Sequence, residues 1–296
     1  MYKRQYLQIV GGFCILNALI PICSSYLRAF GFSKEPLYAS IIGNVINFCL
    51  NAFFLFVLHK GVAGVATATV ISRIINLVIV VLLGAVLVKA KQHPERESNR
   101  AVMGQIIRIG LPSACETAIY NVSMTLVIRF LNQMDAQGLN VTARSYTMQI
   151  TNFSYCVGAA LAQANAIMTG WHIGAKEYDA CDRGTRKAAI IGVIVAVILE
   201  TMFALCSGWI MQLFSKDPQM VSLVGKLLAI DIVLEMGRVT NLVYGQALKT
   251  SGDAVFPVVM GACFMILCSV GGTYLFGIRL GLLAVGAYIG MAVSYT

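Results

Sequence analysis

Long apolar runs recur along the whole chain, and short polar segments separate them. A membrane-spanning helix needs about 20 predominantly apolar residues, and these runs reach that length. The pattern therefore predicts an all-α integral membrane protein. We place nine spans near residues 6–27, 37–58, 63–88, 106–131, 142–170, 188–210, 219–247, 256–277 and from 281 onward.

One polar segment, "VKAKQHPERESNRA" at 88–101, is much longer than the others. Such a segment favours a boundary between two helical bundles. We assign residues 1–88 to the remainder of a first lobe, 89–104 to an inter-lobe linker and 105–296 to a second lobe.

Composition agrees with this interpretation, because 58% of the residues are hydrophobic and only 12% are charged. Soluble domains carry about a quarter charged residues. The net charge of +9 comes mainly from bases in short loops, which is a pattern of membrane topology and gives no reason to expect nucleic-acid binding. Counted on alternate loops, eleven bases fall on one side and three on the other. The positive-inside rule puts the larger set, and with it the linker, in the cytoplasm of a multi-pass protein of the plasma (inner) membrane.

The chain contains an internal repeat. "LRAFGFSKEP" at 27–36 and "LKTSGDAVFP" at 248–257 share Leu, a basic residue, Gly and Pro at an offset of 221. Six predicted spans separate the copies, so both would have the same membrane orientation, as in the parallel repeats of some transporters. The first copy lacks counterparts for about three helices of the second, and the last span is short. We therefore expect a fragment of a twelve-helix protein, lacking about three N-terminal helices and most of the last helix.

Several segments together resemble the multidrug and toxic compound extrusion (MATE) family: "YLRAFGFSKEPLYASIIGNVINFCLNAFFLF", "GVAGVATATVIS", "IRIGLPSACETAIYNV", "GWHIGAKEYDA" and "LEMGRVTNLVYGQALKTSGD". The resemblance covers nearly the whole chain. It implies a two-lobe, twelve-helix antiporter around a central cavity. It also implies exchange of H⁺ or Na⁺ inward for drugs, often cationic, moving outward.

Charged side chains inside membrane spans are costly, so each is first considered as functional. Glu116, Glu200, Asp231, Glu235 and Arg238 lie well inside predicted spans. Asp231, Glu235 and Arg238 are spaced to share one helix face. The structural alternative is that Glu235 and Arg238 merely neutralise each other.

We expect Glu116 to join Glu235 in an ion-coupling site with Asp231 and Arg238. Glu116 lies roughly 15 Å, and Glu235 roughly 20 Å, from the predicted cytoplasmic ends of their helices at 1.5 Å per residue. Two carboxylates at that depth would bind H⁺ or Na⁺, and a cationic substrate would compete with the ion. The sequence indicates no partner for Glu200.

This chain departs from the pattern of some family members. Their helix-seven acid corresponds to Tyr120, one turn after Glu116. Their helix-ten acid corresponds to Arg238, one turn after Glu235. Asn51 replaces an aspartate of the first lobe and cannot titrate.

Polar side chains inside the spans have two possible roles, interhelical hydrogen bonding or lining of a cavity. We assign five of them to a substrate cavity: Tyr120, Asn121, Gln149, Asn152 and Asn241.

The expected function is a cation-coupled efflux antiporter. A lipid-linked oligosaccharide flippase of a related plan is the main alternative, although these spans hold four acids and few deep bases. A membrane-embedded enzyme or channel is a third alternative, but the chain has no deep histidine and no nucleophile motif, so we predict no enzymatic activity. We expect no cofactor and no metal site, only H⁺ or Na⁺ as coupling ion. The expected partners are the bilayer and small organic, in some cases cationic, substrates, with no nucleic acid and a monomeric state.

Overall fold

The computed structural model describes residues 8–89, 99–134, 138–215 and 217–295. These residues form helices and connecting turns, with no β-strand among them. The chain divides into two compact units, Met1–Arg96 and Glu97–Thr296. The division falls inside the predicted linker 89–104, of which residues 90–98 lie outside the described ranges. The last part of that segment is helical, because α5 begins at Asn99.

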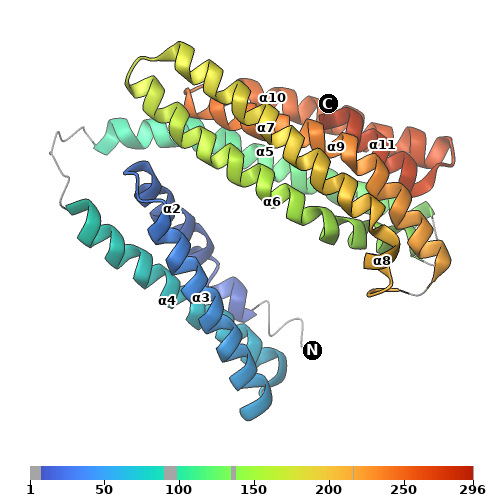
Figure 1. The fold of residues 1–296 in the computed structure, drawn as a ribbon, viewed down its shortest axis with the longest axis horizontal. Helices are drawn as coiled ribbons and strands as arrows, with labels where there is room; N and C mark the ends of the chain where they lie inside the picture. The colour runs from blue at the N-terminus through green and yellow to red at the C-terminus, as the bar shows by residue number, and fades with distance from the viewer. Residues whose placement is uncertain (1–7, 90–98, 135–137, 216, 296) are drawn as a thin grey trace. The chain divides into compact units, whose positions relative to one another are not determined.

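Unit 1 contains α2 and α3 packed against α4, as Figure 1 shows in blue and teal. A small apolar core of Leu27, Ala39, Val80 and Val88 holds them together. The bounds are α2 Ile15–Ala29, α3 Lys34–Ala52, the π-helix η1 Phe53–Val57 and α4 Gly61–Lys89.

Unit 2 is built around α9, which packs against α6, α7 and α11 (Figure 1). Asp217 caps α9 by accepting a hydrogen bond from the amide of Gln219, with Pro218 in the first turn where proline is tolerated. The bounds are α5 Asn99–Met134, α6 Leu139–Gly174, α7 Tyr178–Leu205, α8 Ser207–Met211, α9 Pro218–Thr250, α10 Val255–Phe264, η2 Met265–Val270, η3 Thr273–Arg279 and α11 Leu283–Tyr295.

Small residues bring α6, α7 and α9 together at Val239 of α9. A Cβ atom added at Gly158 of α6 would lie 2.7 Å from one methyl carbon of Val239, and one added at Gly192 of α7 would lie 2.7 Å from the other. Only glycine leaves room for that contact. Close approach over small residues is a common way for helices to associate where lipid removes the hydrophobic driving force.

The outer face of α7 is apolar and its inner face is small or polar. Ile190, Ile194 and Ile198 recur every fourth residue and are 52%, 54% and 61% exposed. Ala196 and Glu200 are buried on the opposite side. This reverses the pattern of a soluble helix and suits a helix that presents its apolar stripe to lipid.

Within the described residues the predicted spans are mainly helical, with boundaries shifted by several residues. Residues 6–7 of the first span lie outside the described ranges, and turns interrupt the helix at residues 13–14 and at Cys206. Among the described residues, four helical segments are both long and apolar enough to cross a membrane, namely residues 34–57, 61–88, 178–205 and 255–279. α5, α6 and α9 are 36, 36 and 33 residues long, which exceeds the length required. Their polar side chains lower the mean hydropathy, and many of these side chains line the cavity described below.

The two turns of the predicted repeat have the same geometry. Gly31 and Gly252, which are 221 residues apart, have φ angles of 88° and 96°, where glycine is favoured. In both turns the amide of the residue after the glycine donates a hydrogen bond to the carbonyl of a leucine four residues before the glycine. The acceptors are Leu27, at 3.0 Å, and Leu248, at 3.1 Å. The same local fold therefore recurs at the predicted positions.

Candidate functional site

A cavity of about 760 Å³ lies within unit 2, between α5, α6, α9, the α10–η2 segment and α11. Most of the polar residues predicted from the sequence line it. Gln149 and Glu235 do not belong to the lining, because Gln149 is exposed elsewhere on α6 and Glu235 is fully buried. The predicted residues that line the cavity are Glu116, Tyr120, Asn121, Asn152, Asp231, Arg238 and Asn241.

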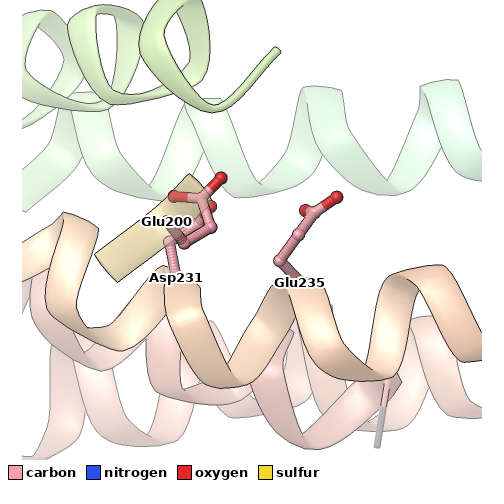
Figure 2. Close-up of side chains that lie close together, drawn as sticks. All are labelled: Glu200, Asp231 and Glu235. Carbon is pink, nitrogen blue, oxygen red and sulfur yellow. The ribbon is translucent and has the colours of Figure 1, made fainter. Parts of the chain in front are cut away.

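Three carboxylates form a buried cluster beside this cavity. Glu200 of α7 meets Asp231 and Glu235 of α9, and one oxygen atom from each lies within 4.8 Å of the others. Figure 2 shows the three carboxylates on the same side of α9. Their exposed fractions are 0%, 1% and 0%. Asp231 alone of the three lines the cavity, so it connects the cluster to that space.

The cluster has few partners for its charge. Both oxygens of Glu200, Oδ2 of Asp231 and Oε1 of Glu235 make no hydrogen bond with the described residues. Ser154 and Thr151 of α6 place hydroxyl groups beside Glu200 and Asp231. Buried oxygen ligands of this kind suit a proton or a small hard cation. The sequence predicted no resident metal, and this cluster provides the donor atoms that a coupling ion would need.

Arg238 is the base nearest the cluster. Its Nη1 lies 2.9 Å from Oε2 of Glu235, three residues earlier on α9. Its guanidinium carbon also lies 5.9 Å from the ring centre of Tyr155 on α6. The predicted pairing of Glu235 with Arg238 is thus present, and it leaves Glu200 and Asp231 without an ion-pair partner among the described residues.

Glu116 does not meet Glu235 as expected. Its carboxylate accepts a hydrogen bond of 2.5 Å from Nζ of Lys249, which lies 14 residues after Glu235 on α9, about 21 Å along the axis. The prediction placed Glu116 and Glu235 at similar depth because it treated the ends of their two helices as lying in one plane. α5 in fact begins at Asn99, 17 residues before Glu116, whereas Lys249 lies next to the last residue of α9. The two helix ends therefore lie at different levels.

The amides assigned to the cavity have different local contacts. The side chain of Asn121 donates to the carbonyl of Thr117 on its own helix at 2.8 Å. Asn152 and Asn241 are exposed on the cavity wall. In unit 1, Asn51 donates to Asn47 at 3.0 Å, so it belongs to a neutral polar network.

Comparison with known proteins agrees with this geometry. The MatE family model matches residues 112–275, which is more than half of the chain. The chain belongs to the MatE family. The uncharacterized transporter YisQ of Bacillus subtilis (strain 168) is 32% identical over 97% of this chain and 64% of its own length. The probable multidrug resistance protein YoeA of the same organism is 24% identical over 80% of this chain and 53% of its own length.

Solved structures show the same fold. An outward-facing multidrug resistance MATE family transporter of the MOP superfamily superimposes with a TM-score of 0.83 at 19% identity, over 98% of this chain and 66% of that one. The chain therefore has the fold of the matching part of that twelve-helix structure and covers 66% of its length. It spans 64% and 53% of the two relatives above.

Sequence reasoning missed three charged residues of this MatE site. The sequence indicated no partner for Glu200. The structure places it beside Asp231, which is 31 residues later in the chain and on another helix. Lys249 falls just after the predicted span 219–247 and was not considered as a partner for Glu116. Arg144, only five residues inside α6, was not considered, yet it is 7% exposed and lines the cavity. A systematic list of all bases within the spans, beside the list of acids, would have drawn attention to it.

Proposed function

We propose that this chain belongs to a cation-coupled efflux antiporter that exports drugs or toxic organic compounds by alternating access, with H⁺ or Na⁺ as the coupling ion. The observation that carries the proposal is the buried cluster of Glu200, Asp231 and Glu235 at the edge of the cavity. A cavity of about 760 Å³ is in the range of sites for small organic ligands.

The chemistry follows from charge balance. Three carboxylates and one neighbouring guanidinium leave a negative excess in a buried place, which is costly in the absence of a bound cation. A proton or Na⁺ at the cluster removes that excess. Arg238 forms an ion pair with Glu235, so Glu200 and Asp231 are the carboxylates available to bind the coupling ion.

Asp231 would couple ion binding to substrate binding. This carboxylate belongs to the cluster and also lines the cavity, so an ion on one side and a positively charged group of the substrate on the other compete for one negative charge. Loss of the ion would favour a substrate-bound arrangement, and its return would favour release. No covalent step is part of the proposed cycle.

Glu116 has a separate role in this proposal. It is held by Lys249 at the last turn of α9, on the same cavity wall. We assign it to the substrate side of the cavity, where opening of the ion pair would expose a carboxylate. Its removal should reduce coupled transport less than removal of a cluster carboxylate.

The test is ion-driven transport in everted membrane vesicles that contain the protein. A pH gradient or a Na⁺ gradient is imposed separately, and accumulation of a fluorescent cationic dye is followed. Asp231→Asn and Glu200→Gln should each lower gradient-driven transport at least tenfold. Asp182→Asn, which changes an exposed acid near the start of α7, should leave it unchanged.

The proposal is rejected if both cluster variants retain full transport driven by either gradient. Transport of dye by the wild type without any ion dependence would reject the coupling and leave efflux standing. The flippase alternative gains no support from the size of the cavity, which suits a small molecule better than a lipid-linked oligosaccharide.

A further inference from the structure

Arg144 is a buried base on the cavity wall that none of the roles above uses. It lies on α6 with 7% of its surface exposed. Its Nε has no hydrogen-bond partner among the described residues. Its Nη2 donates to Sδ of Met124 on α5 at 3.5 Å, and a thioether is a weak acceptor. Among the described residues, the Nε of this guanidinium therefore has no acceptor and its Nη2 has only a weak one.

The other bases of the cavity wall are paired. Arg238 lies against Glu235, and Lys249 lies against Glu116. Arg144 forms no ion pair with a described carboxylate, and Arg238 is the base that interacts with the three acids of the cluster. Burial of an unpaired charge costs several kcal/mol, so a protein retains one where a ligand supplies the counter-charge.

The surroundings of Arg144 suit a ligand that is partly apolar. Tyr288 of α11 is 2% exposed and lines the same cavity as Arg144 and Asp231. Its hydroxyl can donate a hydrogen bond to an anion. The remaining wall is rich in flexible thioethers, which adapt to varied apolar shapes. These side chains are Met124, Met148, Met265 and Met291.

We propose that Arg144 binds the acidic group, a carboxylate, sulfonate or phosphate, of an amphiphilic organic substrate whose apolar part lies against the methionine wall. A planar guanidinium pairs with such groups through two parallel hydrogen bonds. As a transport site, this inference rests on the proposed function. As a binding site, it stands on the geometry of the cavity alone.

The experiment uses three probes with one fluorophore and different charges: dansylglycine (anionic), dansylamide (neutral) and dansylcadaverine (cationic). Binding to the protein in lipid nanodiscs is measured at equilibrium, with no ion gradient, and empty nanodiscs supply the background. Wild type should bind dansylglycine at least tenfold more tightly than dansylamide.

Arg144→Gln should weaken dansylglycine binding roughly tenfold to hundredfold, the loss expected for hydrogen bonds to a charged group. The same variant should leave dansylamide binding unchanged within about twofold. Arg144→Lys keeps the charge without the planar fork and should give an intermediate value. Arg183→Gln, which removes an exposed base near the start of α7, is the matched control and should bind all three probes as wild type does.

Equal binding of dansylglycine and dansylamide by the wild type would overturn the proposal, even if no Arg144 variant folds. An equal loss of all three probes in Arg144→Gln would also overturn it, because that result indicates general damage to the cavity. A chain that selects the anionic probe but shows no ion-driven efflux would retain the binding site and lose the proposed antiport. The two inferences are thus tested separately.

Discussion

Two isosteric substitutions in the carboxylate cluster should change stability in different directions. Glu235→Gln removes one ion-pair partner of Arg238, whereas Glu200→Gln removes a carboxylate that has no ion-pair partner among the described residues. Both side chains are fully buried. The chemistry of the two changes is the same, so any difference between them reports the local charge environment.

The structure sets the size of each effect. Removing one partner of a buried ion pair costs about 3–5 kcal/mol. The Arg238 side chain is 23% exposed, so water in the cavity can solvate it, and we expect Glu235→Gln to destabilise by about 1–3 kcal/mol. Glu200→Gln relieves repulsion from two neighbouring acids but leaves an amide that costs about 1–3 kcal/mol unpaired. We therefore expect Glu200→Gln to be neutral or to stabilise by up to about 2 kcal/mol.

Thermal unfolding in one detergent, followed by far-ultraviolet circular dichroism, measures both variants against wild type and against Asp182→Asn. Glu235→Gln should lower Tm, and Glu200→Gln should leave it unchanged or raise it. A fall in Tm for Glu200→Gln as large as that for Glu235→Gln would show that Glu200 is satisfied by partners other than those seen here. The cluster would then lack the excess negative charge on which the coupling proposal depends.

Two further predictions concern helix packing and the cavity wall. Gly192→Ala should destabilise by about 1–3 kcal/mol, because its Cβ would meet a methyl group of Val239, and adding Val239→Ala should recover part of the loss in the same unfolding assay; additive losses would contradict the contact. Glu116→Gln should weaken, and Lys249→Gln should strengthen, equilibrium binding of a cationic dye by about two- to fivefold, since a partly solvated ion pair is worth about 0.2–1 kcal/mol. Shifts in the same direction for both variants would show that the pair does not set the charge of that wall.

The fold could be predicted because its signals are local. The apolar runs predicted where helical segments lie along the chain, and the repeat was visible because Gly31 and Gly252 each occupy a backbone conformation that favours glycine. The cavity residues on α5 and α9 could be selected because a polar side chain within a span needs a reason to be there.

The partners within the site could not be predicted in the same way. Periodicity fixes which residues share a face of one helix, as it did for Asp231, Glu235 and Arg238. Periodicity does not fix how far one helix is shifted along another. For that reason Glu116 lies opposite Lys249 and not opposite Glu235 as predicted. Periodicity also does not fix how α7 is rotated about its axis, and this rotation decides whether Glu200 faces lipid or Asp231.

The sequence alone thus determined the helical class, the family and the acids that membrane burial makes costly. Tertiary structure alone decided that Glu200 completes a carboxylate cluster, that Glu116 pairs with Lys249, and that Arg144 faces the cavity without a carboxylate among the described residues. The physical reason is that hydropathy and backbone preferences act within about one helical turn of the chain, whereas the charge of a site depends on the shift and rotation of whole helices against one another.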